Sequence, residues 1–532
     1  MSGASWTVGR FVVETLAANG IDTVFGVPGL HNLELYRGLE LARLRHVLVH
    51  HEQNAGFAAD GYARVSGHPA AAFVISGPGV SNALTALAQA YSDSIPLLLV
   101  ASAPVRASLG RGWGVLHELA DQRALAANVT GFAGSARSDV EVGEHLRAAF
   151  ATLRAPRPRP AYVDLPLDLL AEPTALRPEV FAHPPPLPPP GATALAEMLA
   201  LLQAAERPLI IAGGGARHAG SALRHLLETL DAYLVSTVAA KGVVAESHAG
   251  SLGASLPYAS TQERVASADV VLAVGTELSE TDIYTTTRLP IRGQLLRVDV
   301  DERKLADHYQ AQVRVRADAT VTLEMLARDV RPRRGWRSAA GDATALRTAI
   351  EAQAPQTALG TLRAVRAALP SDGVVFSDMT QIAYLGNFAF PAERPGVWFH
   401  PSGYGTLGYA LPAALGAAIA QPQRAVVALA GDFGVQFTLA ELTTAAELDI
   451  TLPVIVWNNE ALGQIRDDMR AAGIAPIGVV ARNPDFIALG TACGAATVRV
   501  HDAAHLEQAL REALRRAGPT LLEVMTADAP RL

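Results

Sequence analysis

Short apolar runs that alternate with helix-length segments are the feature that most constrains how this chain folds. In the first part of the chain, a helical pattern at Phe11–Asn19 precedes apolar runs that indicate strands, at Thr23–Phe25, Val47–His50, Ala71–Ile75 and Pro96–Ser102. Short strands separated by helices are typical of a parallel sheet covered by helices on both faces. The pattern returns from Pro208–Ala212 to Leu295–Val300, and again from Val374–Phe376 to Thr520–Val524. We therefore predict an α/β protein with three consecutive doubly wound parallel-sheet domains.

A proline-rich segment separates the first two predicted domains. Six of the ten residues at 182–191 are proline, which favours an extended linker over a helix or a central strand. A basic stretch at 331–337 marks the end of the second pattern, and we expect another linker there. The predicted domains span residues 1–175, 192–335 and 355–532.

The composition excludes several classes of protein. The chain has 532 residues and is 50% hydrophobic, which supplies enough apolar side chains for real cores and argues against disorder. The formal net charge is −7, only 18% of the residues are charged, and no block of Lys or Arg stands out. A nucleic-acid backbone or an anionic membrane is therefore not an expected partner, and we expect a small-molecule ligand.

The cysteine content and the N-terminal residues bear on the compartment. Cys493 is the only cysteine, so the chain cannot form an internal disulfide or a site built from several thiolates. The N-terminus has no basic region followed by an apolar segment, and the longest apolar stretches contain prolines and are shorter than the ~20 residues of a membrane span. We expect an untargeted, cytoplasmic protein.

Two polar residues follow neighbouring predicted strands in the third domain. Asp432 ends one apolar strand, and Asn459, 27 residues later, ends the next. A strand–helix–strand unit would bring both to the sheet edge where open parallel sheets bind ligands. One carboxylate and one amide oxygen suit a Mg²⁺ ion that also binds phosphate oxygens, and Gly434 would let the backbone approach those phosphates. The spacing alone leaves open that these are ordinary turn and loop residues.

A glycine motif just upstream favours a different cofactor. Gly403, Gly405 and Gly408 form G-x-G-x-x-G before a predicted helix, and Asp432 lies at a distance downstream that suits binding of a ribose. A nicotinamide-dependent oxidoreductase is therefore a rival from another class. Two features weaken this interpretation: Pro412 follows soon after the third glycine, and the adjacent Asn458 and Asn459 have no role in nicotinamide binding.

Glu52 is the polar residue of interest in the first domain. It follows a predicted strand and precedes an Ala- and Gly-rich helical pattern. A carboxyl in that place would be partly desolvated and could share a proton with a bound heterocycle. A surface or helix-capping Glu is the alternative interpretation, and the glycine turn at Ser76–Gly79 is by itself equally compatible with an ordinary turn.

Together these motifs resemble the thiamine diphosphate enzymes of the acetolactate synthase and 2-oxo acid decarboxylase superfamily, along nearly the whole chain. The specific features are HEQNAGFAADGYAR, which contains Glu52, the run SGPGVSNALTALAQAYSDSIPLL from Ser76, and the pair Asp432 and Asn459. The resemblance implies a pyrimidine-binding domain, a middle domain and a diphosphate-binding domain. It also implies a homodimer with shared active sites, assembled into a tetramer.

The resemblance implies roles for individual residues around thiamine diphosphate. Glu52 would hydrogen-bond the aminopyrimidine ring and favour the tautomer that removes the thiazolium proton. Gly405 would offer its carbonyl to the exocyclic amine, and Leu407 would wedge between the two rings. Further implied cofactor contacts are Pro28, Asn82, Thr380, Gln381, Asp432, Phe433, Gly434 and Asn459.

The resemblance also bears on a metal and on a second cofactor. The implied Mg²⁺ ligands are Asp432, Asn459 and the backbone carbonyl of Ala461. In the middle domain, glycine turns at 213–215 and 275 follow apolar strands and could hold a nucleotide, such as the FAD that synthases of this superfamily carry. Many decarboxylases leave the same fold empty, and we favour a structural role for these turns.

Two departures from the synthases favour a decarboxylase. Phe433 stands where the usual Gly-Asp-Gly segment has its second glycine, and residues 116–118 read Leu-His-Glu where synthases carry Phe-Gln-Glu. The closer resemblance is to 5-guanidino-2-oxopentanoate decarboxylase of arginine catabolism. It runs through SLGRGWGVLHELADQ from Ser108, SGYGTLGYALP from Ser402 and WNNEALGQIRDDM from Trp457.

A guanidinium substrate would need carboxylates, because its planar fork of donors prefers bidentate acceptors. His117 is the candidate for proton delivery or for contact with the substrate carboxylate. The other candidate substrate contacts are Val27, His31, Glu118, Gln464, Asp467 and Asp468. For the two aspartates, a solvated helix face is the alternative interpretation.

We therefore predict a thiamine diphosphate- and Mg²⁺-dependent carboxy-lyase that converts 5-guanidino-2-oxopentanoate to 4-guanidinobutanal and CO₂. The nearest enzyme alternative is an acetolactate-synthase-like carboligase. The alternatives from other classes are a nicotinamide-dependent oxidoreductase and a binding protein that holds the cofactor without turnover.

Overall fold

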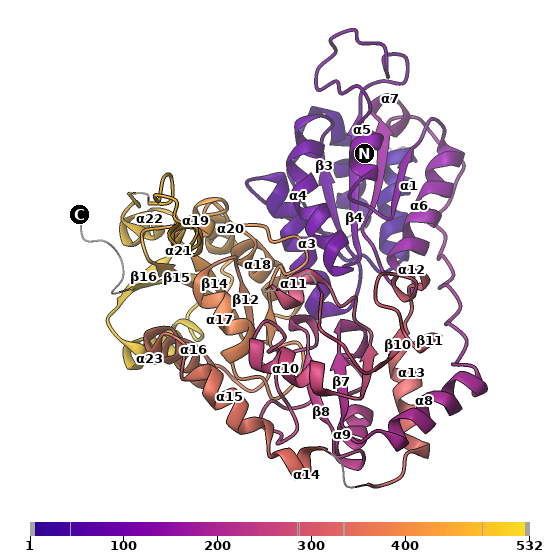
Figure 1. The fold of residues 1–532 in the computed structure, drawn as a ribbon. Coiled ribbons are helices and arrows are strands. Elements are labelled where there is room, and N and C mark those ends of the chain that lie inside the picture. The colour runs from indigo at the N-terminus through magenta and orange to yellow at the C-terminus, as the bar shows by residue number, and fades with distance from the viewer. Residues whose placement is uncertain are drawn as a thin grey trace. The chain divides into compact units, whose positions relative to one another are not determined.

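A computed structural model describes residues 6–42, 44–284, 286, 288–333, 336–480 and 482–526. These described residues form three parallel sheets of six, five and six strands, which confirms the predicted fold class (Figure 1). Two compact units are present, one comprising residues 1–185, 403–499 and 512–532 and the other residues 186–402 and 500–511. The predicted domain ends at residues 1, 335 and 532 lie outside the described residues, and the domain boundaries stay predictions.

The first sheet has the strand order β2-β1-β3-β4-β6-β5. Its strands are β1 Thr23–Gly26, β2 Arg45–Leu48, β3 Ala70–Val74, β4 Leu97–Ala103, β5 Phe132–Ser135 and β6 Ala161–Pro166. The main helices are α1 Val8–Ala18, α3 Glu52–Ser66, α4 Pro78–Asp93 and α6 Asp139–Leu153. Figure 1 shows α3 and α4 on one side of β3 and β4, with α1 and α6 on the other. Every residue of β3 and β4 is buried, as expected for strands covered on both faces.

The middle sheet has the order β11-β10-β9-β7-β8. Its strands are β7 Pro208–Ala212, β8 Tyr233–Ser236, β9 Val270–Val274, β10 Gln294–Asp299 and β11 Val313–Arg316, and helices α8 Ala192–Ala204, α9 Gly220–Thr229, α10 Ala259–Ser267 and α13 Ala319–Asp329 accompany them. Because β7 and β9 are buried throughout, their apolar runs lack the alternation of a half-exposed strand.

The second linker is predicted at residues 331–337, and the end of this segment is helical. Helices α14 Trp336–Ala340 and α15 Ala343–Glu351 lie there and follow the middle sheet. Trp336 is buried against Tyr233, with 5.1 Å between ring centroids in an edge-to-face arrangement. Arg337 forms an ion pair with Asp231 over 3.2 Å. The apolar and charged contacts of these two residues explain why a basic segment is packed here. The proline-rich segment at 184–190, in contrast, forms neither helix nor strand.

The third sheet has the order β13-β12-β14-β15-β17-β16. Its strands are β12 Val374–Ser377, β13 Trp398–Phe399, β14 Val426–Gly431, β15 Leu452–Asn458, β16 Ala496–Val500 and β17 Pro519–Met525. The nearby helices are α17 Gln381–Ala389, α18 Ala410–Ala420, α19 Asp432–Gln436, α20 Glu441–Glu447, α21 Gly463–Ala471 and α22 Phe486–Ala492. In the parallel register of β14 and β15, Gly431 lies opposite Trp457, so both chains leave the sheet at the same edge.

Helices α3 and α18 cross at close range in the first unit. A Cβ atom at Gly61 would lie 1.9 Å from the carbonyl oxygen of Ala413, and one at Gly416 would lie 1.8 Å from the carbonyl oxygen of Ala58. Both distances are far below van der Waals contact, so the crossing requires glycine at both positions. The Ala- and Gly-rich pattern after Glu52 therefore serves tight packing.

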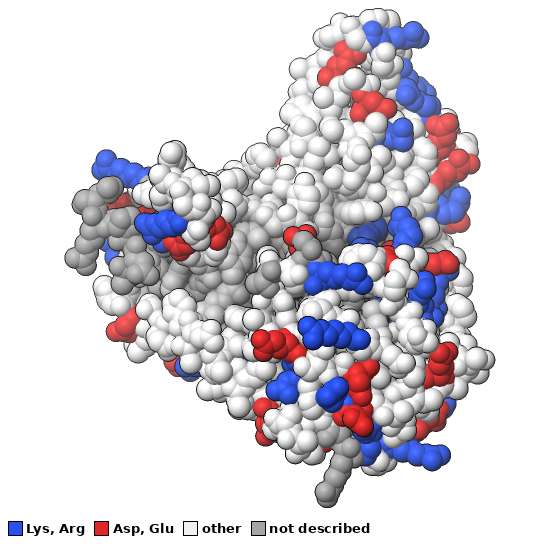
Figure 2. Space-filling model, in the orientation of Figure 1, with Lys and Arg blue, Asp and Glu red and all other residues white. Residues whose placement is uncertain are grey.

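Two further observations concern the surface and the helices. In the described part of the chain, no helix is long and apolar enough to cross a membrane. Figure 2 shows Lys and Arg side chains interspersed with Asp and Glu side chains on the described part of one face. Charges of both signs therefore alternate there, in line with the small formal charge of −7.

Candidate active site

Glu52 begins helix α3, which follows β2 after residues 49–51. The ring of the preceding His51 accepts a hydrogen bond from the backbone N–H of Gln53 over 3.1 Å and caps the helix. Asn82, in the first turns of α4, donates from Nδ2 to Glu52 Oε2 over 3.0 Å. Both residues are partly exposed. The structure thus brings two predicted cofactor residues together and fixes one oxygen of the carboxylate with a neutral donor.

The two histidines predicted to contact the substrate, His31 and His117, lie against each other in the first unit. His31 lies in a short 3₁₀ turn after β1, next to Val27 and Pro28, and its Nδ1 is 2.6 Å from Ser76 Oγ. The rings of His31 and His117 are 5.0 Å apart, edge to face. Burial, and then the nearby His117, lowers the pKa of His31. His31 therefore favours its neutral form and can serve as a hydrogen-bonding partner of Ser76.

His117 has an unusual backbone and an unused ring nitrogen. Its φ is +64°, in the left-handed region that non-glycine residues seldom adopt. Its Nδ1 is buried and has no hydrogen-bond partner among the described residues. A buried ring nitrogen without a partner costs stability, so a ligand atom at this position would satisfy it.

Glu118 does not present a free carboxylate. Oε1 accepts from the backbone N–H of Gly112 over 3.0 Å, and Oε2 accepts from that of Gly114 over 2.7 Å. Both oxygens therefore shape the loop ahead of Glu118. The sequence motif could not reveal this, because the two glycines carry no side chain that signals a bond.

The three predicted metal ligands come together at the edge of the third sheet. Asp432 is 2% exposed and is the first residue of α19, after β14. The backbone N–H of Ala461 donates to Asn459 Oδ1 over 3.2 Å and also to the carboxylate of Asp432. Burial raises the pKa of Asp432, and hydrogen bonds from Asn483 and from backbone N–H groups offset part of that rise. A buried carboxylate with neutral donors around it fits a cation.

Asn483 is a member of this group that the sequence did not suggest. Its Nδ2 donates to Asp432 Oδ2 over 2.6 Å and to Asn458 Oδ1 over 3.0 Å. Its Oδ1 accepts from Gln436 over 3.2 Å. Asn483 lies 51 residues beyond Asp432 in a loop without a recognisable motif, so no sequence signal marks it.

The two adjacent asparagines have different partners. Asn458 is the last residue of β15, and its Nδ2 donates to Glu523 Oε1 of β17 over 2.9 Å. Glu523 is buried and also pairs with Arg499 over 3.0 Å. Asn458 is thereby held to the neighbouring strand. Across the described residues, no group of three or more His, Cys, Asp and Glu could hold a metal ion, so the candidate set has one carboxylate plus amide and backbone oxygens.

The glycine motif at 403–408 forms a loop ahead of α18. Gly405 and Gly408 have φ values of +71° and +84°. A Cβ atom at Gly408 would lie 2.8 Å from Cβ of Phe437, so the loop packs directly on the segment after α19. Leu407 is partly buried. The preceding strand β13 has two residues only, unlike the long first strand of a dinucleotide-binding unit.

The remaining predicted residues lie at helix starts or on a helix surface. Asp467 and Asp468 are on α21, where Asp467 pairs with Arg466 over 3.1 Å and with Arg470 over 3.6 Å. Asp468 is exposed and accepts from Gln464 over 3.0 Å. In the other unit, Thr380 precedes and Gln381 begins α17, and both are partly exposed. Phe433 is partly exposed and Gly434 is buried, both within α19.

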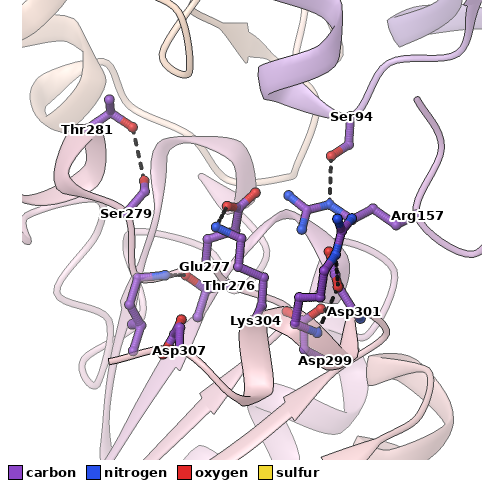
Figure 3. A network of polar contacts seen from close by, with 12 residues as sticks. Ser94, Arg157, Thr276, Glu277, Ser279, Thr281, Asp299, Asp301, Lys304 and Asp307 are labelled. Atoms are coloured by element: carbon purple, nitrogen blue, oxygen red, sulfur yellow. Dashed lines mark hydrogen bonds and ion pairs between the residues drawn. The ribbon is translucent and has the colours of Figure 1, made fainter. Parts of the chain in front are cut away.

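The middle-domain glycine turns pack against each other. A Cβ atom at Gly213 would lie 2.2 Å from the carbonyl oxygen of Gly275, and the N–H of Gly215 donates to that oxygen over 3.0 Å. Polar side chains beyond β9 and β10 contact one another: Glu277 pairs with Lys304, and the hydroxyls of Ser279 and Thr281 are 3.0 Å apart (Figure 3). Close backbone packing accounts for these glycines without a nucleotide.

Three family models match separate parts of the chain. The N-terminal thiamine pyrophosphate-binding domain matches residues 6–125, the central domain matches residues 195–326, and the C-terminal thiamine pyrophosphate-binding domain matches residues 378–524. The chain belongs to the thiamine pyrophosphate enzyme family. Thiamine pyrophosphate is another name for thiamine diphosphate, which is therefore the cofactor of this protein. The nicotinamide alternative has no support from these matches.

Curated relatives of this family cover nearly the whole chain. "Probable 2-ketoarginine decarboxylase AruI" of Pseudomonas aeruginosa is 49% identical over 529 residues, 98% of this chain and 94% of the relative. The large subunit of acetolactate synthase isozyme 1 of Escherichia coli is 29% identical over 534 residues, 98% of this chain and 94% of that protein. The isozyme 3 large subunit is 30% identical over 536 residues, with 95% and 92% covered. These findings confirm the predicted superfamily and a thiamine diphosphate-dependent 2-oxo acid decarboxylase.

Proposed function

We propose that this family member decarboxylates 5-guanidino-2-oxopentanoate to 4-guanidinobutanal and CO₂ with the help of Mg²⁺. The observation that carries the proposal is the 49% identity, across 98% of the chain, to a relative named for 2-ketoarginine, which is the same oxo acid. The two synthases of Escherichia coli are 29% and 30% identical. This difference favours a decarboxylase over a carboligase.

Glu52 and the glycine loop would hold the cofactor. Bound thiamine diphosphate supplies a nucleophilic carbon and takes up the electron pair left when CO₂ departs. Asn82 holds Oε2 of Glu52, which leaves Oε1 to hydrogen-bond the pyrimidine ring. The carbonyl of Gly405 would accept from the exocyclic amine, and Leu407 would keep the two rings bent. Further contacts would come from Pro28, Thr380, Gln381, Phe433 and Gly434.

Mg²⁺ would join the diphosphate to Asp432, Asn459 and the carbonyl of Ala461. The burial of Asp432 supports this assignment, as does its closeness to the other two residues. Asn483 donates to the same carboxylate, so its amide would have to release Oδ2 or turn its oxygen toward the ion.

His117 would handle the proton or the substrate carboxylate. Its buried Nδ1 has no partner within the described residues, and a neutral His31 lies against its ring. His117 could donate a hydrogen bond to the carboxylate of the oxo acid, and after CO₂ leaves it could deliver the proton that becomes the aldehyde hydrogen. Val27 and Glu118 would line this side.

The guanidinium end of the substrate would meet the acidic side chains of α21. Asp467 already accepts two arginine guanidinium groups, and Asp468 is exposed with Gln464 beside it. The guanidinium of the substrate would therefore find Asp468 the more accessible acceptor.

The Asp468→Asn variant is expected to raise KM for the guanidino substrate about 10-fold or more and to leave kcat nearly unchanged. A hydrogen bond to a charged group contributes roughly 1.5–3 kcal/mol, and about 1.4 kcal/mol is tenfold. Initial rates against substrate concentration measure this effect. Asp329→Asn, at an exposed aspartate paired with Arg328, is the control and should match the wild type. An unchanged KM in Asp468→Asn would remove Asp468 from the substrate site.

We further propose a homodimer with shared active sites, assembled into a tetramer that works in the cytoplasm. Some large apolar side chains near candidate site residues are exposed, namely Leu30 (73%) beside His31, Trp113 (64%) in the loop before His117 and Phe437 (57%) against Gly408. Exposed apolar side chains of this size favour cover by another chain. Light scattering after size exclusion would give the mass of the assembly, and a monomer at micromolar concentration would contradict the shared site.

Proton NMR of the purified enzyme tests the proposed reaction directly. The enzyme with Mg²⁺ and thiamine diphosphate receives 5-guanidino-2-oxopentanoate in one tube and pyruvate in another. We expect 4-guanidinobutanal in the first tube and no product in the second. Acetolactate in the second tube would make the enzyme a carboligase, and an inert first tube would reject the proposed substrate.

A further inference from the structure

Four side chains that the proposed mechanism leaves unused form a buried polar cluster in the first unit. Asp60 and Arg64 lie on α3, Asp93 ends α4, and Tyr409 directly follows the glycine loop. Arg64 bridges the two carboxylates, with its Nε 2.6 Å from Asp60 Oδ1 and its Nη2 2.6 Å from Asp93 Oδ2. The Tyr409 hydroxyl donates to Asp60 Oδ1 over 2.5 Å.

The cluster holds both ends of the loop at 403–409. At one end, the backbone N–H of Gly403 donates to Asp93 Oδ1 over 2.9 Å. At the other end, Tyr409 is bonded to Asp60, and neither side chain is exposed. A Cβ atom at Gly403 would lie 2.5 Å from Asp93 Oδ1, so the loop approaches α4 at the closest range a backbone allows.

The cluster is poorly suited to a purely stabilising role, because removing its charged groups from water costs free energy that their pairing only partly offsets. Burial lowers the pKa of Arg64, but Asp60, Tyr409 and Asp93 outweigh this effect and raise it well above its ordinary value, so Arg64 stays charged. Burial also raises the pKa of Asp93. Buried ion pairs often stabilise no more than apolar side chains of the same size, and their defined directions are better suited to fixing geometry.

We infer that Asp60, Arg64, Asp93 and Tyr409 are positioning residues, which fix the two ends of the 403–409 loop so that Gly405 and Leu407 meet the cofactor in one geometry. The inference rests on the proposed cofactor contacts of Gly405 and Leu407. Because α3 also begins at Glu52, the cluster ties the loop to the helix that carries the candidate cofactor-activating carboxylate.

The test compares Tyr409→Phe with Tyr62→Phe. Tyr62 belongs to α3 and is buried like Tyr409, and its hydroxyl donates to Asp22 Oδ1 over 2.6 Å. Each variant thus loses one tyrosine–aspartate hydrogen bond, and both should lower Tm. Isothermal titration of thiamine diphosphate into Mg²⁺-loaded apoenzyme gives Kd. We expect Kd to rise about 10-fold in Tyr409→Phe and in Asp93→Asn, and to match the wild type in Tyr62→Phe.

Two outcomes would overturn the inference. The cluster is only structural if Tyr409→Phe and Asp93→Asn lower Tm but leave Kd unchanged, and equally if Tyr62→Phe raises Kd as much as they do. A Leu407→Ala variant separates this inference from the proposed function. If Leu407→Ala weakens cofactor binding while Tyr409→Phe and Asp93→Asn do not, the positioning role alone fails. If Leu407→Ala also binds normally, the proposed cofactor contacts fail and the positioning role with them.

Discussion

The Glu52→Gln variant is expected to turn over its 2-oxo acid at least ~100-fold more slowly than the wild type, the scale of a lost acid–base group. Glutamine has nearly the same shape, and its carbonyl oxygen can still accept from Asn82, which donates to Glu52 over 3.0 Å. What the variant loses is an oxygen that can share a proton with the pyrimidine ring. Initial rates at saturating Mg²⁺ and thiamine diphosphate measure the loss, and an unchanged Tm shows that the fold is intact.

Glu14→Gln provides a matched control for this experiment. Glu14 is partly exposed on α1 and pairs with Arg10 over 2.7 Å, so the variant removes one carboxylate of similar exposure from the same domain. Its turnover should equal that of the wild type. Near-wild-type turnover in Glu52→Gln would reject the proposed proton sharing between Glu52 and the pyrimidine ring.

The sheets could be predicted because their signal is local. Each buried strand is a short apolar run, so the sequence predicts β4 and β7 to within one residue of their bounds. The crossing of α3 and α18 could not be predicted, since Gly61 and Ala413 are far apart in the chain and their contact depends on the packed domains. Trp336 is a similar case, because only its contact with Tyr233 distinguishes a packed helix from a linker.

Only part of the candidate site could be predicted from the sequence, for the same reason. Asp432 and Asn459 could be placed together from one strand–helix–strand unit, and the structure brings them together through the N–H of Ala461. The hydrogen-bond partners that already occupy a side chain could not be predicted from the sequence. The bonds of Glu118 go to backbone N–H groups, and Asn483 reaches Asp432 from a loop whose path no motif encodes.

The Asp432→Ala variant is expected to abolish Mg²⁺-dependent retention of thiamine diphosphate. Asp432 supplies the only carboxylate proposed for the metal, beside one amide and one backbone oxygen, and Mg²⁺ relies on such charged oxygen ligands to replace its water. The measurement is the amount of cofactor that stays with the enzyme after gel filtration, with and without Mg²⁺. Calorimetry during a chelator titration gives the affinity of the enzyme for thiamine diphosphate as Mg²⁺ is removed.

Asp164→Ala separates loss of the metal from loss of a buried carboxylate. Asp164 and Asp432 are both 2% exposed, and Asp164 accepts hydrogen bonds from Ser135 and Tyr162 in the first domain. Both variants should lower Tm, because each leaves buried donors without an acceptor. Only Asp432→Ala should lose the cofactor. The proposed metal site contains no carboxylate besides Asp432. If the Asp432→Ala variant still retains the cofactor in a Mg²⁺-dependent way and as tightly as the wild type, the ion is held elsewhere.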